Sequence, residues 1–97
     1  MKYQVVITGE AQEDIEALDN ANRSKIERSF KTIEQEDIEC VFVKFLGQKL
    51  FEIKSGRVRA LFTYKEDKLV IVGVVFLKTT QKTPQKYITR ARKILEI

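Results

Sequence analysis

The chain has 97 residues, of which 43% are hydrophobic, and this suits one compact domain with a single modest core. So short a chain has little room for a deep cofactor pocket, and we expect no bound cofactor. The formal net charge of +4 is unevenly distributed: residues 1–39 hold five Lys and Arg against ten Asp and Glu, whereas residues 40–97 hold thirteen against four. The second part therefore predicts a surface that attracts a polyanion, although two solvated faces would have the same composition.

Cysteine content and the N-terminal sequence both indicate the reducing cytoplasm. Cys40 is the single cysteine, which excludes an internal disulfide, and its place in the apolar run 40–43 predicts a buried structural thiol. Residues 1–4 show no signal-peptide pattern, and no segment is long enough to span a bilayer. We therefore expect a cytoplasmic protein that has no membrane partner.

The N-terminal third predicts one strand followed by two amphipathic helices. Alternating side chains predict a strand over residues 2–7, and Thr8 is placed to cap the first helix. The second helix is expected over residues 21–35. The apolar positions of the two helices are Ala11, Ile15, Leu18, Ile26, Phe30 and Ile33. We expect the outer surface of this helical pair to be acidic.

From residue 50 onward the apolar period changes to two, which predicts three strands over residues 50–54, 57–64 and 69–77. A tight turn is expected at Ser55-Gly56, and a short polar turn is expected at residues 65–68. These features predict a meander of three neighbouring antiparallel strands.

A final helix is expected to begin with Thr83 as its N-cap and Pro84 at its first helical position. The order of elements is then β-α-α-β-β-β-α. This order predicts an α+β fold, in which an antiparallel sheet packs against helices, within a single domain that spans residues 1–97.

The two predicted turns set a sheet register that separates the side chains into two faces. A turn at Ser55-Gly56 would place Lys54 opposite Arg57, and Glu52 opposite Arg59. One face is then an apolar core surface made of Phe51, Ile53, Val58, Ala60, Phe62, Tyr64, Leu69, Ile71, Val75 and Leu77. The other face is solvent-exposed and carries Glu52, Lys54, Arg57, Arg59, Val74, Phe76 and Lys78.

Four cations on one sheet face carry an energetic cost, because like charges on paired strands destabilise a sheet by about 0.2–1 kcal/mol per pair. A phosphate backbone would offset this cost, and Phe76 could stack on a base. The alternative is purely structural, with Glu52 neutralising Arg59 across the strands and the other cations solvated. We favour the nucleic-acid interpretation.

The segment after the last predicted strand extends this basic surface. Hydroxyl, amide and ammonium groups over residues 78–84, among them Gln81 and Lys82, suit contacts with phosphate and 2′-OH groups. The same segment is also an ordinary helix start. Lys86 begins a basic stripe along the helix, although cations near a helix C-terminus are stabilised by the dipole without any function.

Two strings in the second half resemble a known toxin family. Residues 50–54 (LFEIK) with 57–62 (RVRALF) are similar to the hairpin of HigB-like, phage-type toxins of the RelE superfamily. Residues 76–84 (FLKTTQKTP) are similar to the FxKKTQKTP segment of that branch. The resemblance covers residues 48–95 well, whereas residues 1–40 match only in helix pattern.

The resemblance implies a type II toxin: an mRNA interferase, which is an endoribonuclease that cleaves mRNA on the ribosome and so inhibits translation. Carried over by position, Arg59 is expected to stabilise the scissile phosphate, with Lys54 and Lys78 beside it. We add Arg57 as a group that could stabilise the leaving oxygen, so the expected catalytic residues are Lys54, Arg57, Arg59 and Lys78. Expected RNA contacts are Lys49, Phe76, Gln81, Lys82, Lys86 and Tyr87. The helical position of Tyr87 favours a core role for this side chain.

The chain contains no histidine, whereas many HigB-like relatives carry one near the last strand. A His-based acid/base pair is therefore unavailable, and since no His/Cys cluster supports a metal, we expect metal-independent cleavage. Attack by the RNA 2′-OH still needs a base, an acid and charge stabilisation. Lys54 is the candidate base because neighbouring cations disfavour its charged form, and Glu52 is the alternative.

Two other functions remain open at this point. The same fold supports a ParE-like inhibitor of DNA gyrase that has no nuclease site, or a non-catalytic phage remnant that binds only RNA or an antitoxin. The basic face favours the nuclease, and the lack of histidine keeps the remnant possible. We expect an acidic segment of a cognate antitoxin, encoded adjacently, to cover the basic face or to displace the final helix.

Overall fold

The computed structural model describes residues 2–97, which form a five-stranded sheet and three α-helices. In chain order the elements are β1 (Gln4–Ile7), α1 (Gly9–Glu16), α2 (Asn20–Gln35), the 3-10 turn η1 (Ile38–Cys40), β2 (Phe42–Gly47), β3 (Leu50–Ser55), β4 (Val58–Lys65), β5 (Leu69–Leu77) and α3 (Gln85–Leu95). Within residues 2–97 there is no helix with the length and apolar character needed to cross a membrane.

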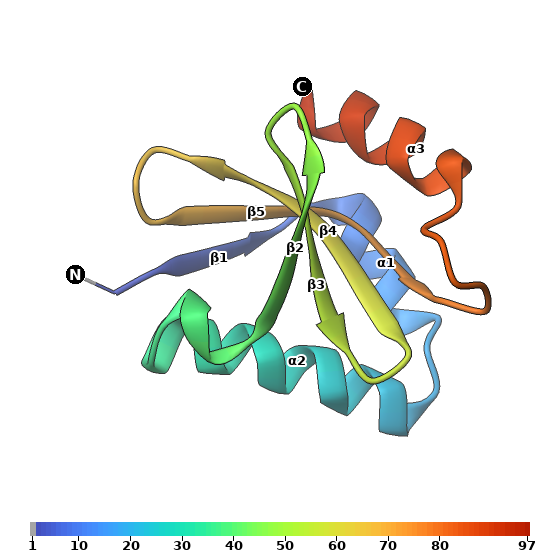
Figure 1. The fold of residues 1–97 in the computed structure, drawn as a ribbon. Helices are drawn as coiled ribbons and strands as arrows, with labels where there is room; N and C mark the ends of the chain where they lie inside the picture. The colour runs from blue at the N-terminus through green and yellow to red at the C-terminus, as the bar shows by residue number, and fades with distance from the viewer. Residues whose placement is uncertain (1) are drawn as a thin grey trace.

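The sheet lies between two helical layers (Figure 1). Its strand order is β1-β5-β4-β3-β2, with α1 and α2 on one face and α3 on the other. The predicted α+β fold is confirmed. The sheet is mixed rather than wholly antiparallel, because β1 runs parallel to β5, and the two helices between β1 and β2 carry the chain to the opposite edge.

Each face of the sheet has its own hydrophobic core. The larger core joins the sheet to α1, α2 and η1, and its buried members are Ala11, Ile15, Ile26, Phe30, Ile33, Ile38, Ile53, Val58, Ala60, Phe62, Val70, Val72 and Val75. The smaller core lies under α3 and consists of Leu50, Leu61, Val74, Phe76 and Ala91. The helical apolar positions predicted from the 3.6-residue period all contribute to the larger core.

The strand β2 was missed by the sequence-based prediction. Several of its apolar side chains are exposed, because β2 is an edge strand that pairs with β3 alone. Cys40 ends η1, before the chain enters the sheet at Phe42, and its side chain is exposed. The predicted buried thiol is therefore wrong.

The turn between β3 and β4 lies one residue later than predicted. Ser55 pairs with Val58, which leaves Gly56-Arg57 as the turn, and Gly56 has the positive φ of 59° that a type II′ turn needs at its first central residue. Lys54 consequently lies opposite Arg59 rather than Arg57, so the predicted partners are wrong. Because the pairing shifts by two residues, the side chains of β3 and β4 keep their predicted faces.

A bulge in the β4–β5 pair changes which side chains of β5 enter the larger core. Leu61 pairs with Val74 but Phe62 pairs with Val72, so Gly73 is left without a partner. Val70 and Val72 are therefore buried. The predicted core residues Leu69 and Ile71 are only half-buried, and Leu77 at the end of the strand is exposed, so the prediction is wrong for these three positions.

The start of α3 also differs from the prediction. The helix begins at Gln85 and its N-cap is Pro84, which provides no side-chain hydrogen bond. Thr83 does not cap the helix, because its hydroxyl donates instead to Oε2 of Glu52. The predicted cap at Thr8 is confirmed: its Oγ1 accepts from the backbone N–H of Ala11 at 3.2 Å.

The bulge residue Gly73 gives a test of how α3 packs on the sheet. A Cβ at Gly73 would lie 2.8 Å from Cγ of Leu95, so we expect Gly73→Ala to lower the free energy of unfolding by about 1–3 kcal/mol through overpacking. Chemical denaturation measures this change in the free energy of unfolding. The control is Gly9→Ala, where a Cβ meets nothing within 4 Å and stability should rise by about 0.4–1 kcal/mol. Equal effects at both positions would show that α3 does not press on Gly73.

Candidate nucleic-acid interface

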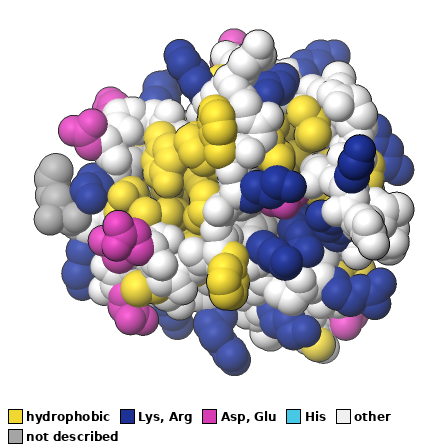
Figure 2. All heavy atoms as spheres, in the orientation of Figure 1, with side chains coloured by type: hydrophobic (Ala, Val, Ile, Leu, Met, Phe, Trp, Pro, Cys, Tyr) yellow, Lys and Arg dark blue, Asp and Glu magenta, His cyan; other side chains and the backbone are white. Residues whose placement is uncertain are grey.

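Strand pairing brings five cations together at the end of the sheet near the β3–β4 turn, on the same side as α3. Lys54 lies opposite Arg59, and the backbone N–H of Lys78 donates to the carbonyl of Arg57 at 2.8 Å. Lys44 of β2 lies opposite Glu52. We call this surface the basic strand face, and it consists of Lys44, Lys54, Arg57, Arg59 and Lys78. Dark blue side chains gather over this region, between β3 and α3, in Figure 2.

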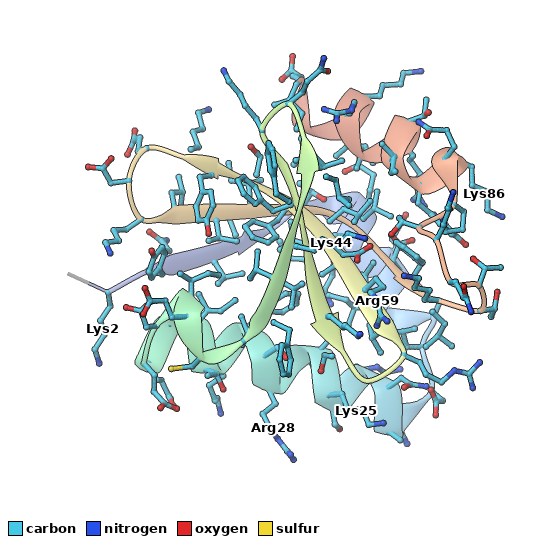
Figure 3. All side chains as sticks on the ribbon, in the orientation of Figure 1. Lys2, Lys25, Arg28, Lys44, Arg59 and Lys86 are labelled. Carbon is cyan, nitrogen blue, oxygen red and sulfur yellow. The ribbon has the colours of Figure 1, made fainter. Side chains whose placement is uncertain are left out.

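Arg59 is the most constrained cation of the basic strand face. Only 7% of the residue is exposed, and its Nη1 donates to the carbonyls of Gly56 at 2.7 Å and Val58 at 3.0 Å. Figure 3 shows the side chain beside the β3–β4 hairpin, near its turn. Arg59 was expected to face solvent, and this expectation is wrong, because the guanidinium folds back onto its own turn.

The Nε of Arg59 is a buried donor for which residues 2–97 supply no hydrogen-bond acceptor. The nearest carboxylate oxygen is Oε1 of Glu52 at 3.9 Å, which is an ion pair but too long for a hydrogen bond. A buried donor without a partner costs about 1–3 kcal/mol, more when it is charged, and such groups are rare in folded proteins. An anionic ligand at this point would satisfy Nε.

Glu52 joins the basic strand face to the segment that leads into α3. The residue is 2% exposed, and its Oε2 accepts a 2.5 Å hydrogen bond from Oγ1 of Thr83, 31 residues further along the chain. The structural alternative raised from the sequence is thus present in part, since Glu52 does lie beside Arg59. This pair leaves Nε of Arg59 without a hydrogen-bond acceptor, however, and the carboxylate of Glu52 already accepts a hydrogen bond from Thr83.

The aromatic pair at the edge of the smaller core was expected to contact RNA. Phe76 is 5% exposed, and its ring stacks on that of Tyr87 with centroids 4.0 Å apart and planes 10° from parallel. Burial therefore leaves Phe76 no free face for a base, and the predicted base stacking by this residue is not supported. Tyr87 packs against the smaller core, as its helical position suggested, and Nζ of Lys86 lies 5.0 Å from its ring centroid.

The other expected RNA contacts are only partly brought to the basic strand face. Gln81 and Lys82 are exposed in the loop before α3. Lys49 lies at the opposite end of β3, in the β2–β3 turn, where it lines a pocket of about 420 Å³ with residues from the end of α3. Lys49 is therefore separate from the other cations. Within residues 2–97 no three metal-ligating side chains gather.

Three cations near the site were not predicted. Lys44 was missed because β2 was missed, although the aromatic and β-branched residues of Phe42-Val43-Lys44-Phe45 are a strand signal. Lys25 and Arg28 of α2 extend the basic surface beside the β3–β4 turn (Figure 3), where the carbonyl of Lys25 accepts from Oγ of Ser55 at 3.2 Å. The acidic exterior expected for the helical pair is therefore wrong for this side of α2.

The role of Glu52 can be measured with two variants. Glu52→Ala removes both of its interactions and leaves the buried charge of Arg59 unpaired, so we expect a loss of about 3 kcal/mol in the free energy of unfolding. Thr83→Val removes only the hydroxyl and should cost about 1 kcal/mol. Both values come from urea denaturation. An equal loss in the two variants would mean that Glu52 does not stabilise Arg59.

Comparison with known proteins places this geometry in a family. Residues 13–96 match the family described as phage derived protein Gp49-like (DUF891). No curated protein sequence is similar enough to the chain to count as a match.

Solved structures of RelE toxins share the fold. The toxin–antitoxin complex RelBE2 from Mycobacterium tuberculosis matches with a TM-score of 0.68 at 18% identity, over 80% of this chain and 100% of that one. The RelE–RelB complex from Pyrococcus horikoshii matches with a TM-score of 0.66 at 19% identity, over 81% and 98%. An arginine double mutant of the Escherichia coli toxin RelE, in the free state, matches with a TM-score of 0.68 at 20% identity, over 96% and 97%.

These structures show the fold alone at such low identity, whereas the family match extends over most of the chain. The resemblance inferred from residues 48–95 is thereby confirmed. The protein belongs to the phage-derived Gp49-like family, a family of RelE-type toxins.

Proposed function

We propose that this protein is the toxin of a toxin–antitoxin system and acts as a metal-independent endoribonuclease on mRNA in the ribosome. The observation that carries the proposal is the guanidinium of Arg59, which two backbone carbonyls hold in place while its buried Nε has no acceptor within residues 2–97. A phosphate oxygen is a suitable acceptor, because charge-assisted hydrogen bonds from Arg to phosphate are strong and directional. The surrounding cations favour binding of a polyanion.

The cleavage step needs only groups that the basic strand face and the RNA supply. The RNA 2′-oxygen attacks the adjacent phosphorus, the bond from phosphorus to the 5′-oxygen breaks, and the products are a 2′,3′-cyclic phosphate and a 5′-hydroxyl. Arg59 would stabilise the charge that develops on the phosphate oxygens. Lys54, opposite Arg59, would accept the proton of the 2′-OH. Arg57 or Lys78 would stabilise the leaving 5′-oxygen, which takes a proton from water to become the 5′-hydroxyl.

The proposed partners are mRNA on the ribosome and an antitoxin. Two of the RelE relatives described above were solved as complexes with an antitoxin, which supports an antitoxin for this chain. The thirteen Lys and Arg among residues 40–97, against four Asp and Glu, favour an acidic partner segment. The small number of acid/base groups in the site is consistent with an enzyme that relies on the ribosome to position its substrate.

Arg59 gives the main test of this function. Arg59→Lys keeps a positive charge beside Glu52 but loses the planar fork, so we expect ribosomal mRNA cleavage to fall by about 10²–10³-fold. The control is Lys65→Met, which removes one exposed charge from the far end of the same strand and should leave cleavage unchanged. Urea denaturation establishes that both variants fold. A folded Arg59→Lys protein with full activity would contradict the proposed site.

The dependence on ribosomes separates the proposed function from its alternatives. In a purified translation reaction we expect cleavage of a reporter mRNA, and with the same mRNA free of ribosomes we expect none, since the chain contains no histidine and the basic strand face offers few other acid/base groups. DNA gyrase supercoiling is measured in parallel and should be unaffected. Inhibition of gyrase without any cleavage would instead support a ParE-like toxin. Binding of RNA without either effect would support a non-catalytic remnant.

A further inference from the structure

The two edge strands of the sheet differ in whether another element hydrogen-bonds to their outer side. At the β1 edge, α2 provides a partner: the backbone N–H of Val5 donates to Oε2 of Glu34 at 2.9 Å. At the other edge, β2 pairs with β3 alone. An uncovered edge strand exposes backbone donors and acceptors to which another extended chain can bind.

The register shows which backbone groups of β2 point outward. Ser55 and Val58 close a two-residue turn, so their backbone N–H and C=O groups hydrogen-bond to each other. Along β3 the backbone groups of successive residues then point alternately toward β4 and toward β2. The backbone groups of Lys54 and Glu52 therefore hydrogen-bond to those of Phe42 and Lys44 in β2. The N–H and C=O of Val43, which lies between these two residues, point away from the sheet.

The side chains of β2 are more apolar than a solvated edge requires. Phe42 is 78% exposed and Phe45 is 61% exposed, and Val43 between them is also exposed. The ring of Phe45 lies 5.1 Å from that of Phe51, which continues into the larger core. A large apolar area beside β2 is visible in yellow in Figure 2. Val43 and Phe45 lie on the same face of the sheet as Phe51. Exposed apolar surface that several residues share is typical of an interaction site, whereas single exposed apolar residues are not.

One charge on β2 limits what can bind there. Lys44 is exposed and lies on the same side of the sheet as the basic strand face. A second copy of the chain that paired β2 with β2 in antiparallel fashion would bring two Lys44 side chains close together, and this opposes self-association. An incoming strand with a carboxylate opposite Lys44 would gain an ion pair instead.

We propose that the β2 edge is the docking site for an acidic, strand-forming segment of a partner protein, which adds a sixth strand to the sheet. The assignment of this partner as the antitoxin rests on the proposed function. Apolar side chains of the segment would pack beside Val43 and Phe45, and an acidic side chain would lie opposite Lys44. That acidic residue would reach the rim of the basic strand face, close to Lys54 and Arg59.

The test uses the full chain and two synthetic nine-residue peptides, one that alternates Val with Glu and one that alternates Val with Lys. We expect the Val/Glu peptide to bind in NMR titrations, to shift the amide signals of β2 and to slow hydrogen exchange at the amide of Val43. The Val/Lys peptide should not bind. Lys44→Glu should reverse this preference. Failure of the Val/Glu peptide to bind at millimolar concentration would overturn the proposal, and so would binding that leaves the signals of β2 unchanged.

Val43→Pro separates backbone pairing from side-chain contact. Because the N–H of Val43 has no partner in the sheet, proline is compatible with this edge position and yet removes the donor that an added strand needs. We expect Val43→Pro to lower the affinity for the Val/Glu peptide at least tenfold, and Val43→Ala to lower it only a few-fold. Equal effects would overturn strand addition, and the Lys44→Glu result decides the question if Val43→Pro does not fold.

The same proteins keep this proposal distinct from the nuclease. If strand addition fails while the wild type still cleaves mRNA on ribosomes, the docking site is wrong and the proposed function stands. If the Val/Glu peptide binds β2 while the wild type cleaves no mRNA, the docking site stands and the nuclease function is wrong. Sedimentation of the chain alone, expected to show a monomer, would overturn the choice of partner if it showed a dimer that Lys44→Glu disrupts.

Discussion

The carboxylate of Glu52 is held almost out of water between the hydroxyl of Thr83 and the guanidinium of Arg59. A buried charge must be paired or hydrogen-bonded, since an isolated one costs several kcal/mol. Thr83 satisfies Glu52 directly, and the separation of 3.9 Å from Arg59 gives electrostatic stabilisation without using the Nε donor. A closer ion pair would have used this donor. Incomplete bonding of this kind is typical of functional sites.

One face of the sheet carries both a basic surface and a packed core. Helix α3 covers one end of this face over Leu50, Leu61 and Val74, and the other end holds the basic strand face. The bulge at Gly73 determines which side chains of β5 reach each core. With strict alternation along the nine residues of the strand, Val70, Val72 and Val74 would all lie on one face of the sheet. The bulge lets β5 supply Val70 and Val72 to one core and Val74 to the other.

Local patterns were sufficient to predict most of the fold and every member of the basic strand face except Lys44. The face of each strand residue survived an error in the position of the turn, because an even shift of register preserves parity, and this kept Lys54 beside Arg59. The burial of Arg59 could not be predicted in this way. It depends on carbonyls of the adjacent turn, on Glu52 and on Thr83, a residue far along the chain that also looks like a helix cap. The strand β2 was missed because an exposed apolar edge resembles a buried run in sequence.

The parallel pairing of β1 with β5 affects when the chain folds during synthesis. Gln4 lies opposite Leu69, a separation of 65 positions, whereas β2, β3, β4 and β5 pair with their neighbours in sequence. Contacts between distant segments form late, because closing the intervening loop costs entropy before the contact is gained. A nascent chain therefore cannot complete its sheet, or place Phe76 beside Arg59, until β5 has emerged from the ribosome. For a protein proposed to act on translating ribosomes, this order of assembly delays formation of the basic strand face until late in the chain's own synthesis.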